Sequence, residues 1–354
     1  MVSPPAVNPV SANNSTTSLP SSKPFYHPSK LLLRIYGPQV GHLIDRSTEL
    51  SILRRLARNH IGPRLLGTFQ NGRFEQFFQA TTLTKSDIRQ PSTSRHISKR
   101  LKELHSGIEL TPAERTSGPI AWKNIHKWLP QANHIIATLP PSHPPPTNWP
   151  LFLSTLSTYE TFLSSHPYEL VFAHNDTQYG NILRLDPPAP STRSPLLLPQ
   201  NAHRKLIVID FEYASANPRG FEFANHFCEW MADYHDEAAP HVMNPARYPS
   251  IEAQKNFLRA YVEHRLGGAG GEVDESVVEE LLAETRRWRA AAHAMWCVWG
   301  VVQAKVGGGE EEFDYLKYAE ERAVLFWGDM VALGLVEEGL LGEHDVKVKK
   351  IVEA

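Results

Sequence analysis

The segment from His174 to Tyr213 constrains this chain more than any other part of its sequence. It contains the run HNDTQYGN, which begins at His174, and the run IDFEY, which ends at Tyr213. Short apolar runs stand on both sides of these motifs, at Leu170–Ala173, Ile182–Leu185 and Leu206–Ile209. Short apolar runs bounded by turn residues are typical of buried strands. The pattern predicts a strand, a polar loop, and then a hairpin made by the second and third runs.

Three side chains of this segment match the chemistry of phosphoryl transfer. Asp176 could accept a proton from an attacking hydroxyl, while Asn181 and Asp210 could hold Mg²⁺ on the phosphates of ATP. An aspartate in a loop is by itself usually a turn residue. An asparagine five positions later and a second aspartate after the next apolar strand favour the catalytic interpretation. The motif therefore predicts ATP as a co-substrate and Mg²⁺ as a cofactor.

Two positions separate these motifs from those of protein kinases. Asn175 stands where protein kinases carry an arginine, and Glu212 stands where they carry the glycine of Asp-Phe-Gly. We therefore expect a relative of the protein kinases that phosphorylates a small molecule and is not switched by activation-loop phosphorylation. His174 is expected to pack and orient the loop, since buried histidines are commonly structural.

Composition excludes several classes of function. Hydrophobic residues make up 41% of the 354 positions and charged residues 21%, and the net charge is -2. Such a chain can form about two ordinary domains, and its charge does not recruit nucleic acid or an anionic membrane. No apolar stretch is long enough to span a bilayer. Cys228 and Cys297 lie in apolar surroundings, which predicts buried thiols in the reducing cytoplasm.

The chain divides into four predicted regions. Residues 1–28 are rich in Ser, Asn and Pro and are expected to be disordered, and residues 341–354 to form a charged, solvated tail. Residues 29–80 should form a small lobe with a strand at Leu31–Tyr36, a helix at Ile44–Arg58 and a hairpin about the turn Gln70–Gly72. Residues 81–340 should form a larger, mainly helical lobe. Its helical patterns run over Phe221–Tyr234, Ile251–Arg265, Glu275–Val306 and Phe313–Leu335.

Several long strings resemble the choline/ethanolamine kinase family, and most of all its choline kinase branch of the fungal type. They include LLLRIYG, HNDTQYGNIL, IDFEYASANPRGFEFANHFCEWMADY and WCVWGVVQAK, in an order that covers Leu31 to about Trp327. The resemblance implies a protein-kinase-like α+β fold, with a small antiparallel-sheet lobe and a larger helical lobe. It implies transfer of the γ-phosphate of ATP to choline, which yields phosphocholine and ADP for phosphatidylcholine synthesis. It also implies a homodimer.

The same resemblance implies roles for individual residues. Asp176 would be the catalytic aspartate, Asn181 and Asp210 would hold the metal, and Gln178 would face the nucleotide. Arg34 would replace the usual lysine on the phosphates, with Glu49 as its ion-pair partner. The hinge that stacks on adenine would consist of Gly72, Arg73, Phe74, Glu75, Gln76 and Phe77. The cage around the substrate would consist of Tyr213, Glu229, Tyr234, Trp296, Trp299 and Tyr318.

The proposed cage has a physical rationale of its own. A quaternary ammonium cannot donate an N–H hydrogen bond, so proteins hold it by cation–π attraction to aromatic faces. Trp296 and Trp299 are three positions apart in a predicted helix and so share a face. Aromatic residues at that spacing usually fill cores, and only the surrounding strings favour a binding role. The aromatic set favours choline over ethanolamine, whose primary ammonium would need more hydrogen-bond acceptors.

One departure from the family pattern keeps alternatives open. The family carries two strands and a phosphate-covering loop before LLLRIYG, whereas this chain has no glycine before Gly37. We expect a shortened N-terminal sheet and weak ATP binding, because backbone N–H donors over the phosphates would be missing. The alternatives are an ethanolamine kinase and a catalytically weakened choline-binding protein. Aminoglycoside kinases share the aspartate motifs but would not need the paired tryptophans.

Overall fold

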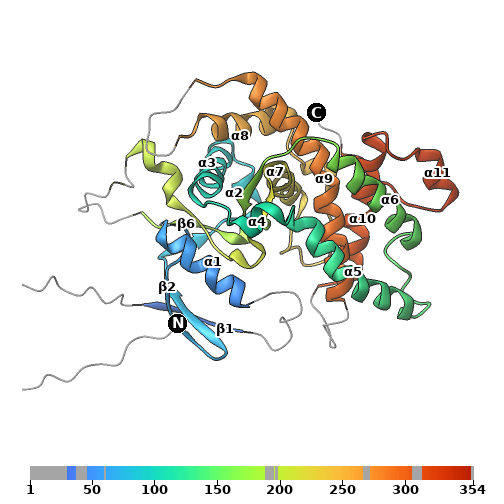
Figure 1. The fold of residues 1–354 in the computed structure, drawn as a ribbon, viewed down its shortest axis with the longest axis horizontal. Coiled ribbons are helices and arrows are strands. Elements are labelled where there is room, and N and C mark those ends of the chain that lie inside the picture. The colour runs from blue at the N-terminus through green and yellow to red at the C-terminus, as the bar shows by residue number, and fades with distance from the viewer. Residues whose placement is uncertain are drawn as a thin grey trace, which may run out of the picture. The chain divides into compact units, whose positions relative to one another are not determined.

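The computed structural model describes residues 30–36, 46–59, 61–187, 195, 198–265, 272–304 and 313–351. The chain forms two compact units, residues 1–79 and 80–354, whose elements are labelled in Figure 1. The expectations for the first 28 residues lie outside the described part of the chain. None of the helices in the described ranges combines the length and apolar character needed to cross a membrane.

The first unit is a three-stranded antiparallel sheet with one helix. Strands β1 (Leu31–Ile35), β2 (Leu65–Phe69) and β3 (Gly72–Gln76) pair in the order β1-β3-β2, and α1 spans Arg46–Arg58. The turn between β2 and β3 requires a small residue at its end, because a Cβ on Gly72 would meet the ring of Phe69 and the backbone oxygen of Arg34. The predicted strand, helix and hairpin are confirmed.

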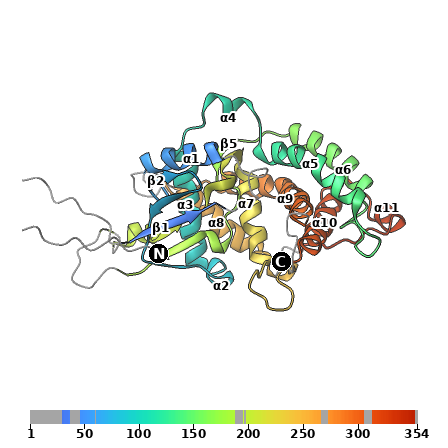
Figure 2. The same cartoon turned by 90° about the horizontal axis from the view of Figure 1, so that it is seen from below.

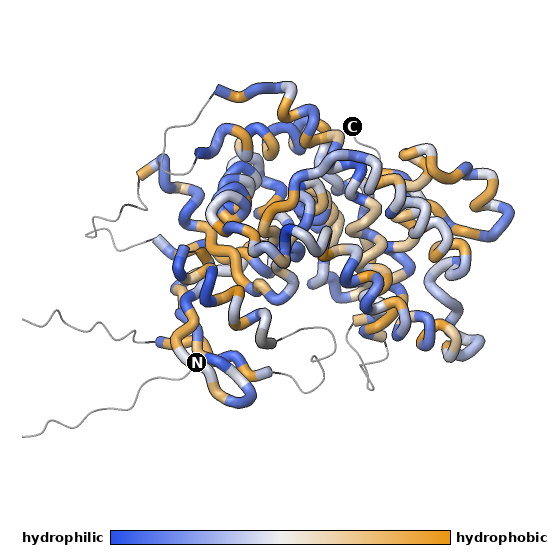
Figure 3. Tube along the Cα trace, viewed as in Figure 1, coloured by the Kyte–Doolittle hydropathy of each residue, from blue (hydrophilic) through white to orange (hydrophobic). Residues whose placement is uncertain are grey.

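The second unit is mainly helical and is built around one long helix, α9 (Glu275–Gln303), which packs against α10, α7 and α5. Figure 2 shows α9 and α10 side by side, and Figure 3 shows hydrophobic residues recurring along the helices between hydrophilic ones. Alanines at positions 290, 291, 292 and 294 are fully buried and allow neighbouring helices to approach α9 closely. The other helices are α2 (Lys85–Ile88), α3 (Pro91–Gly107), α4 (Pro112–Thr116), α5 (Ile120–Thr138), α6 (Trp149–Ser164), α7 (Arg219–Cys228), α8 (Ile251–Glu263), α10 (Tyr315–Ala332) and α11 (Glu338–Glu343).

Two small antiparallel sheets hold the motif segments in this unit. Strands β4 (Ala80–Thr82), β6 (Ile182–Leu185) and β7 (Leu206–Val208) form one sheet in the order β4-β6-β7. Strand β5 (Leu170–Ala173) pairs with β8 (Ser215–Pro218) in the other. The predicted hairpin is therefore confirmed as β6 and β7. Both motif loops lie between these sheets, one after β5 and the other after β7.

One expectation about the second unit is wrong. The predicted helix Phe221–Tyr234 ends at Cys228 and continues as a 3₁₀ turn, Glu229–Met231. The chain then leaves the helix, and the backbone N–H of Tyr234 donates to the Tyr179 hydroxyl at 2.8 Å. In the C-terminal segment the Lys349 backbone N–H donates to the Val324 carbonyl at 2.9 Å and its ammonium pairs with Glu321 at 2.5 Å, whereas the side chains of Lys347 and Lys350 are mostly exposed. Helix amphipathicity does not report such tertiary contacts. The α+β class itself is confirmed.

Candidate active site

The loop after β5 is anchored by a buried carboxylate from α7. Glu222 is fully buried and accepts hydrogen bonds from the backbone N–H groups of His174 at 2.5 Å and Asn175 at 3.1 Å, and from the Thr177 hydroxyl at 2.9 Å. Burial would raise its pKa, but His105 and these donors hold the pKa below its usual value. Glu222 therefore fixes the loop as a charged acceptor. The sequence analysis did not identify this residue.

His174 and Asn175 hold the loop from inside. The His174 ring donates from Nε2 to the Ile209 carbonyl at 2.8 Å and accepts the Asp176 backbone N–H on Nδ1 at 3.2 Å. Burial lowers the pKa of His174, so the ring is neutral. Asn175 is fully buried with a φ of 66°, and its Nδ2 donates to the Tyr213 carbonyl at 2.9 Å. Asparagine tolerates this left-handed conformation better than most side chains do.

The structure brings the three predicted phosphoryl-transfer residues together. The side-chain amide of Asn181 donates to Asp176 Oδ2 at 2.8 Å and to the Asp176 carbonyl at 2.9 Å. The backbone N–H of Ile209 donates to the Asn181 carbonyl at 2.9 Å, which sets Asp210 beside this pair. Asp210 has a φ of 65°, again in the left-handed region. Asn181 thus turns its amide nitrogen to Asp176 and keeps its amide oxygen for another partner.

The local electrostatics favour a cation. Burial raises the pKa of Asp176 well above its usual value, and the neighbouring charges of Glu229, Asp210 and Glu212 raise the pKa further. Mutual repulsion of this kind is relieved when a cation binds between carboxylates. Gln178 lines the same cavity, and its side chain also accepts the Gly180 backbone N–H at 3.2 Å.

All the predicted substrate-cage residues line one cavity of about 390 Å³ with the acidic residues. Its aromatic rings meet edge to face: Trp296 lies 5.3 Å from Tyr213 and 5.4 Å from Trp299, measured between ring centroids. Trp299 in turn lies 6.1 Å from Tyr318. Helices α9 and α10 therefore present their aromatic pairs to one space. Three further lining residues went unpredicted as cage members, namely Glu212, Phe313 and Tyr315.

A buried arginine behind the cavity was also missed. Arg322 is fully buried on α10, one helical turn after Tyr318, and its Nη2 donates to Glu229 Oε1 at 2.7 Å. Its Nε donates to the Tyr318 hydroxyl at 3.0 Å. The Tyr234 hydroxyl donates to the other oxygen of Glu229, Oε2, at 2.7 Å. The spacing of Tyr318 and Arg322 on a helix was the only available signal, and it does not distinguish a buried arginine from a surface one.

Residues of the first unit correct one detail of the ATP-site prediction and add another. Glu49 forms an ion pair with Arg73 at 2.7 Å, and its expected pairing with Arg34 stays a prediction. Gly72–Gln76 is the central strand of the sheet and not a hinge, and the connection that follows it begins at Phe77. A buried arginine needs nearby carboxylates, and Arg73 has both Glu49 and Glu75, the latter at 2.5 Å. The roles of these residues toward ATP stay predictions.

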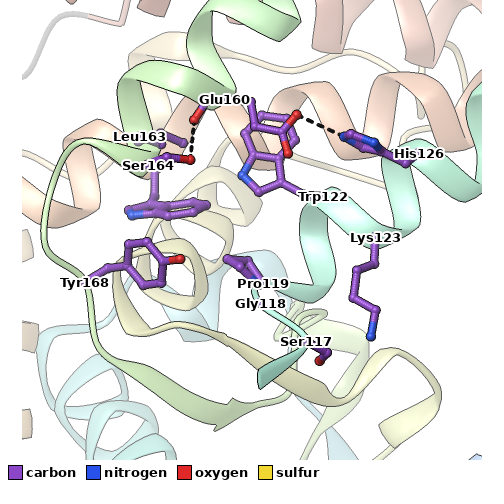
Figure 4. A pocket seen from close by; sticks show the side chains of 11 residues that line it. Ser117, Gly118, Pro119, Trp122, Lys123, His126, Glu160, Leu163, Ser164 and Tyr168 are labelled. Carbon is purple, nitrogen blue, oxygen red and sulfur yellow. Dashed lines mark hydrogen bonds and ion pairs between the residues drawn. The ribbon is translucent and has the colours of Figure 1, made fainter. Parts of the chain in front are cut away.

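A second cavity of about 350 Å³ lies elsewhere in the second unit (Figure 4). It is walled by Trp122, Tyr168 and Trp288, the last of which also comes from α9. Its carboxylate, Glu160, pairs with His126 at 3.0 Å. Lys123 also lines this cavity, and Figure 4 shows its side chain extending toward Ser117.

Comparisons with known proteins point to one family. The choline/ethanolamine kinase family model matches residues 12–327. The choline kinase of Saccharomyces cerevisiae is 34% identical over 395 residues, covering 87% of this chain and 68% of that protein. The choline kinase of Schizosaccharomyces pombe is 36% identical over 371 residues, covering 88% of this chain and 79% of that protein.

A solved structure supports the fold. The choline kinase of Cryptosporidium parvum Iowa II superposes with a TM-score of 0.68 at 23% identity, covering 87% of this chain and 84% of the other. This likeness confirms the expected fold. Since the family model and two fungal relatives each match most of the sequence, the chain belongs to the choline/ethanolamine kinase family.

Proposed function

We propose that this protein is an ATP-dependent choline kinase that forms phosphocholine and ADP. One observation carries the proposal: a single cavity is lined both by Asp176 with its acidic neighbours and by the aromatic rings of α9 and α10. A molecule with a hydroxyl at one end and a quaternary ammonium at the other matches both kinds of lining. The fungal relatives named above are choline kinases.

In the proposed reaction Asp176 acts on the choline hydroxyl. The hydroxyl oxygen forms a bond to the γ-phosphorus, the bond from that phosphorus to the β,γ-bridging oxygen breaks, and ADP leaves with the electron pair. The hydroxyl proton passes to the Asp176 carboxylate. Asn181 holds Oδ2 of that carboxylate, and Oδ1 has no hydrogen-bond partner among the described residues, so Oδ1 can receive the proton.

The donor set fits Mg²⁺. Asp210, Glu212 and the amide oxygen of Asn181 offer the hard oxygen ligands that Mg²⁺ prefers, and all three residues line the cavity. When bound, the ion would neutralise charge on the phosphates of ATP. We assign Asn181 and Asp210 to it. The buried carboxylate repulsion at Asp176 supports a cation at this point.

ATP would further require residues of the first unit, and we keep Arg34, Glu49, Arg73 and the segment Phe74–Phe77 as candidates for it, with Gly72 closing their hairpin. Family resemblance also leads us to propose a homodimer, which sedimentation can test.

Cys228 and Cys297 are buried free thiols, which agrees with a cytoplasmic location.

The test is turnover of choline and of ethanolamine by the purified protein with ATP and Mg²⁺. We expect phosphocholine as the main product and a higher kcat/KM for choline. A higher kcat/KM for ethanolamine would make the protein an ethanolamine kinase. If calorimetry detects choline binding while no phosphorylated amine forms and no ATP binds, the protein is a choline-binding protein instead, and the proposal is wrong.

A further inference from the structure

The polar atoms of the aromatic cage are already paired with one another. Glu229 accepts from Arg322 on Oε1 and from Tyr234 on Oε2, both at 2.7 Å. The Tyr318 hydroxyl accepts from Arg322 Nε at 3.0 Å. The Tyr213 hydroxyl accepts from the Trp299 indole N–H at 2.9 Å. What these side chains offer to a ligand is therefore mostly ring surface.

The indole N–H of the other cage tryptophan, Trp296, is also hydrogen-bonded, and its partner lies outside the cage. It donates to Asn225 Oδ1 at 2.8 Å, and Asn225 is fully buried on α7. The Asn225 amide donates in turn to the Asn175 carbonyl at 3.1 Å. Trp296 is thus fixed with its polar edge turned to Asn225, which leaves its apolar surface for the cavity.

The charge of the cage carboxylate, Glu229, is paired as well. Glu229 and Arg322 are both almost completely buried, and their charges cancel. Glu229 consequently contributes little net attraction to a cation, although it lines the cavity. The attraction comes from the ring faces and from Asp176, Asp210 and Glu212.

We infer that Arg322, together with Tyr234, makes this pocket select a quaternary ammonium over a primary one, by neutralising Glu229 and taking an acceptor position on each of its oxygens. A trimethylammonium group has no N–H to satisfy, so the weakened acceptor costs it nothing. A primary ammonium has three N–H donors and finds in Glu229 a poorer partner than a free carboxylate would be. Arg322 acts through Glu229 and is a positioning residue. The inference rests on one part of the proposed function, namely that this cavity binds an amine; it does not require phosphoryl transfer.

The experiment measures Kd for choline and for ethanolamine by calorimetry, in the wild type and in Tyr234→Phe. The substitution keeps the ring and frees Glu229 Oε2. We expect the ratio of the ethanolamine Kd to the choline Kd to fall about tenfold, because ethanolamine gains an acceptor and binds more tightly in absolute terms. A substitution that merely loosened the pocket would weaken both amines.

Tyr168→Phe, in the cavity of Figure 4, is the matched control. It removes a tyrosine hydroxyl outside the aromatic cage, and the ratio should stay within about twofold of the wild type. Arg322→Met, with folding checked by its unfolding temperature, should lower the ratio as Tyr234→Phe does. The inference is overturned if Tyr234→Phe leaves the ratio unchanged, if the wild type binds ethanolamine more tightly, or if neither amine binds. Failure of phosphoryl transfer with tight, selective choline binding would refute the proposed function alone.

Discussion

Two cavities of similar size in the second unit share an aromatic lining and differ in charge. The candidate active site and the cavity of Figure 4 have volumes of about 390 and 350 Å³, and α9 supplies tryptophan to both. The cavity of Figure 4 has one carboxylate, Glu160, which pairs with His126, and it also contains Lys123. Among the described residues that line the candidate active site there are four carboxylates and no lysine or arginine.

Aromatic walls alone do not distinguish the two cavities. Rings attract a cation by about 0.5–2 kcal/mol, an amount that a nearby ammonium can cancel. In the candidate active site Arg322 neutralises Glu229 from behind the wall. Asp176 is buried and has neighbours of its own sign, and both raise its pKa. The excess of carboxylates therefore distinguishes the candidate active site from the other cavity, more than its size does.

The largest expected effect comes from removing Asp176, the central carboxylate of the candidate active site. Asp176→Asn keeps the shape but removes the proton acceptor, and we expect kcat to fall about a thousandfold. Glu160→Gln makes the same chemical change in the cavity of Figure 4 and should leave kcat within about twofold. Steady-state assays of both variants, with matched unfolding temperatures, test the pair. Undiminished turnover by Asp176→Asn would refute the catalytic role.

Removing one aromatic wall should have an intermediate effect. Trp299→Leu takes away a ring face and its bond to Tyr213, and we expect KM for choline to rise about tenfold with a smaller change in kcat. Tyr168→Leu is the matched change in the other cavity, at a side chain that is 38% exposed. It should leave KM unchanged. Equal effects of the two substitutions would mean that the choice of cavity is wrong.

The smallest expected effect is a shift in pH dependence. Because the pKa of Asp176 is raised, this group takes up a proton at a higher pH than an ordinary carboxyl. We expect kcat/KM for choline to fall as the pH is lowered through that raised value, since protonated Asp176 cannot accept the hydroxyl proton. Bound choline should lower the pKa, so kcat should fall only at more acid pH. Coincident acid limbs of the two profiles would contradict this.

Much of the fold and site could be predicted because the signals were local. The strand, helix and hairpin of the first unit followed from apolar runs and the Asn-Gly turn, and the β6–β7 hairpin from two further runs. Asp176, Asn181 and Asp210 were named from their spacing. The predicted helix through Tyr234 was wrong because a tertiary hydrogen bond to Tyr179 decides that segment.

Glu49 shows the same limit at the level of one ion pair. It pairs with Arg73 of β3, a partner that no local pattern indicated. Glu222, Asn225 and Arg322 likewise lie far along the chain from the groups that they hold. A single sequence gives no sign of which buried polar groups will pair, because such pairs depend on how helices pack.

The order of residues along the chain was enough to determine the class of fold, the family, and the set of acidic and aromatic side chains on which the chemistry depends. Strands, turns and helix faces report on neighbours within a few positions, and those are what a pattern records. Only the tertiary structure decided that both sets line one cavity, that Glu222 holds the loop, and that Arg322 neutralises Glu229. Side chains become buried, and buried charges become paired, through contacts between segments that are distant in the sequence. An unpaired buried charge destabilises the fold, so the folded chain brings a partner of opposite charge beside it.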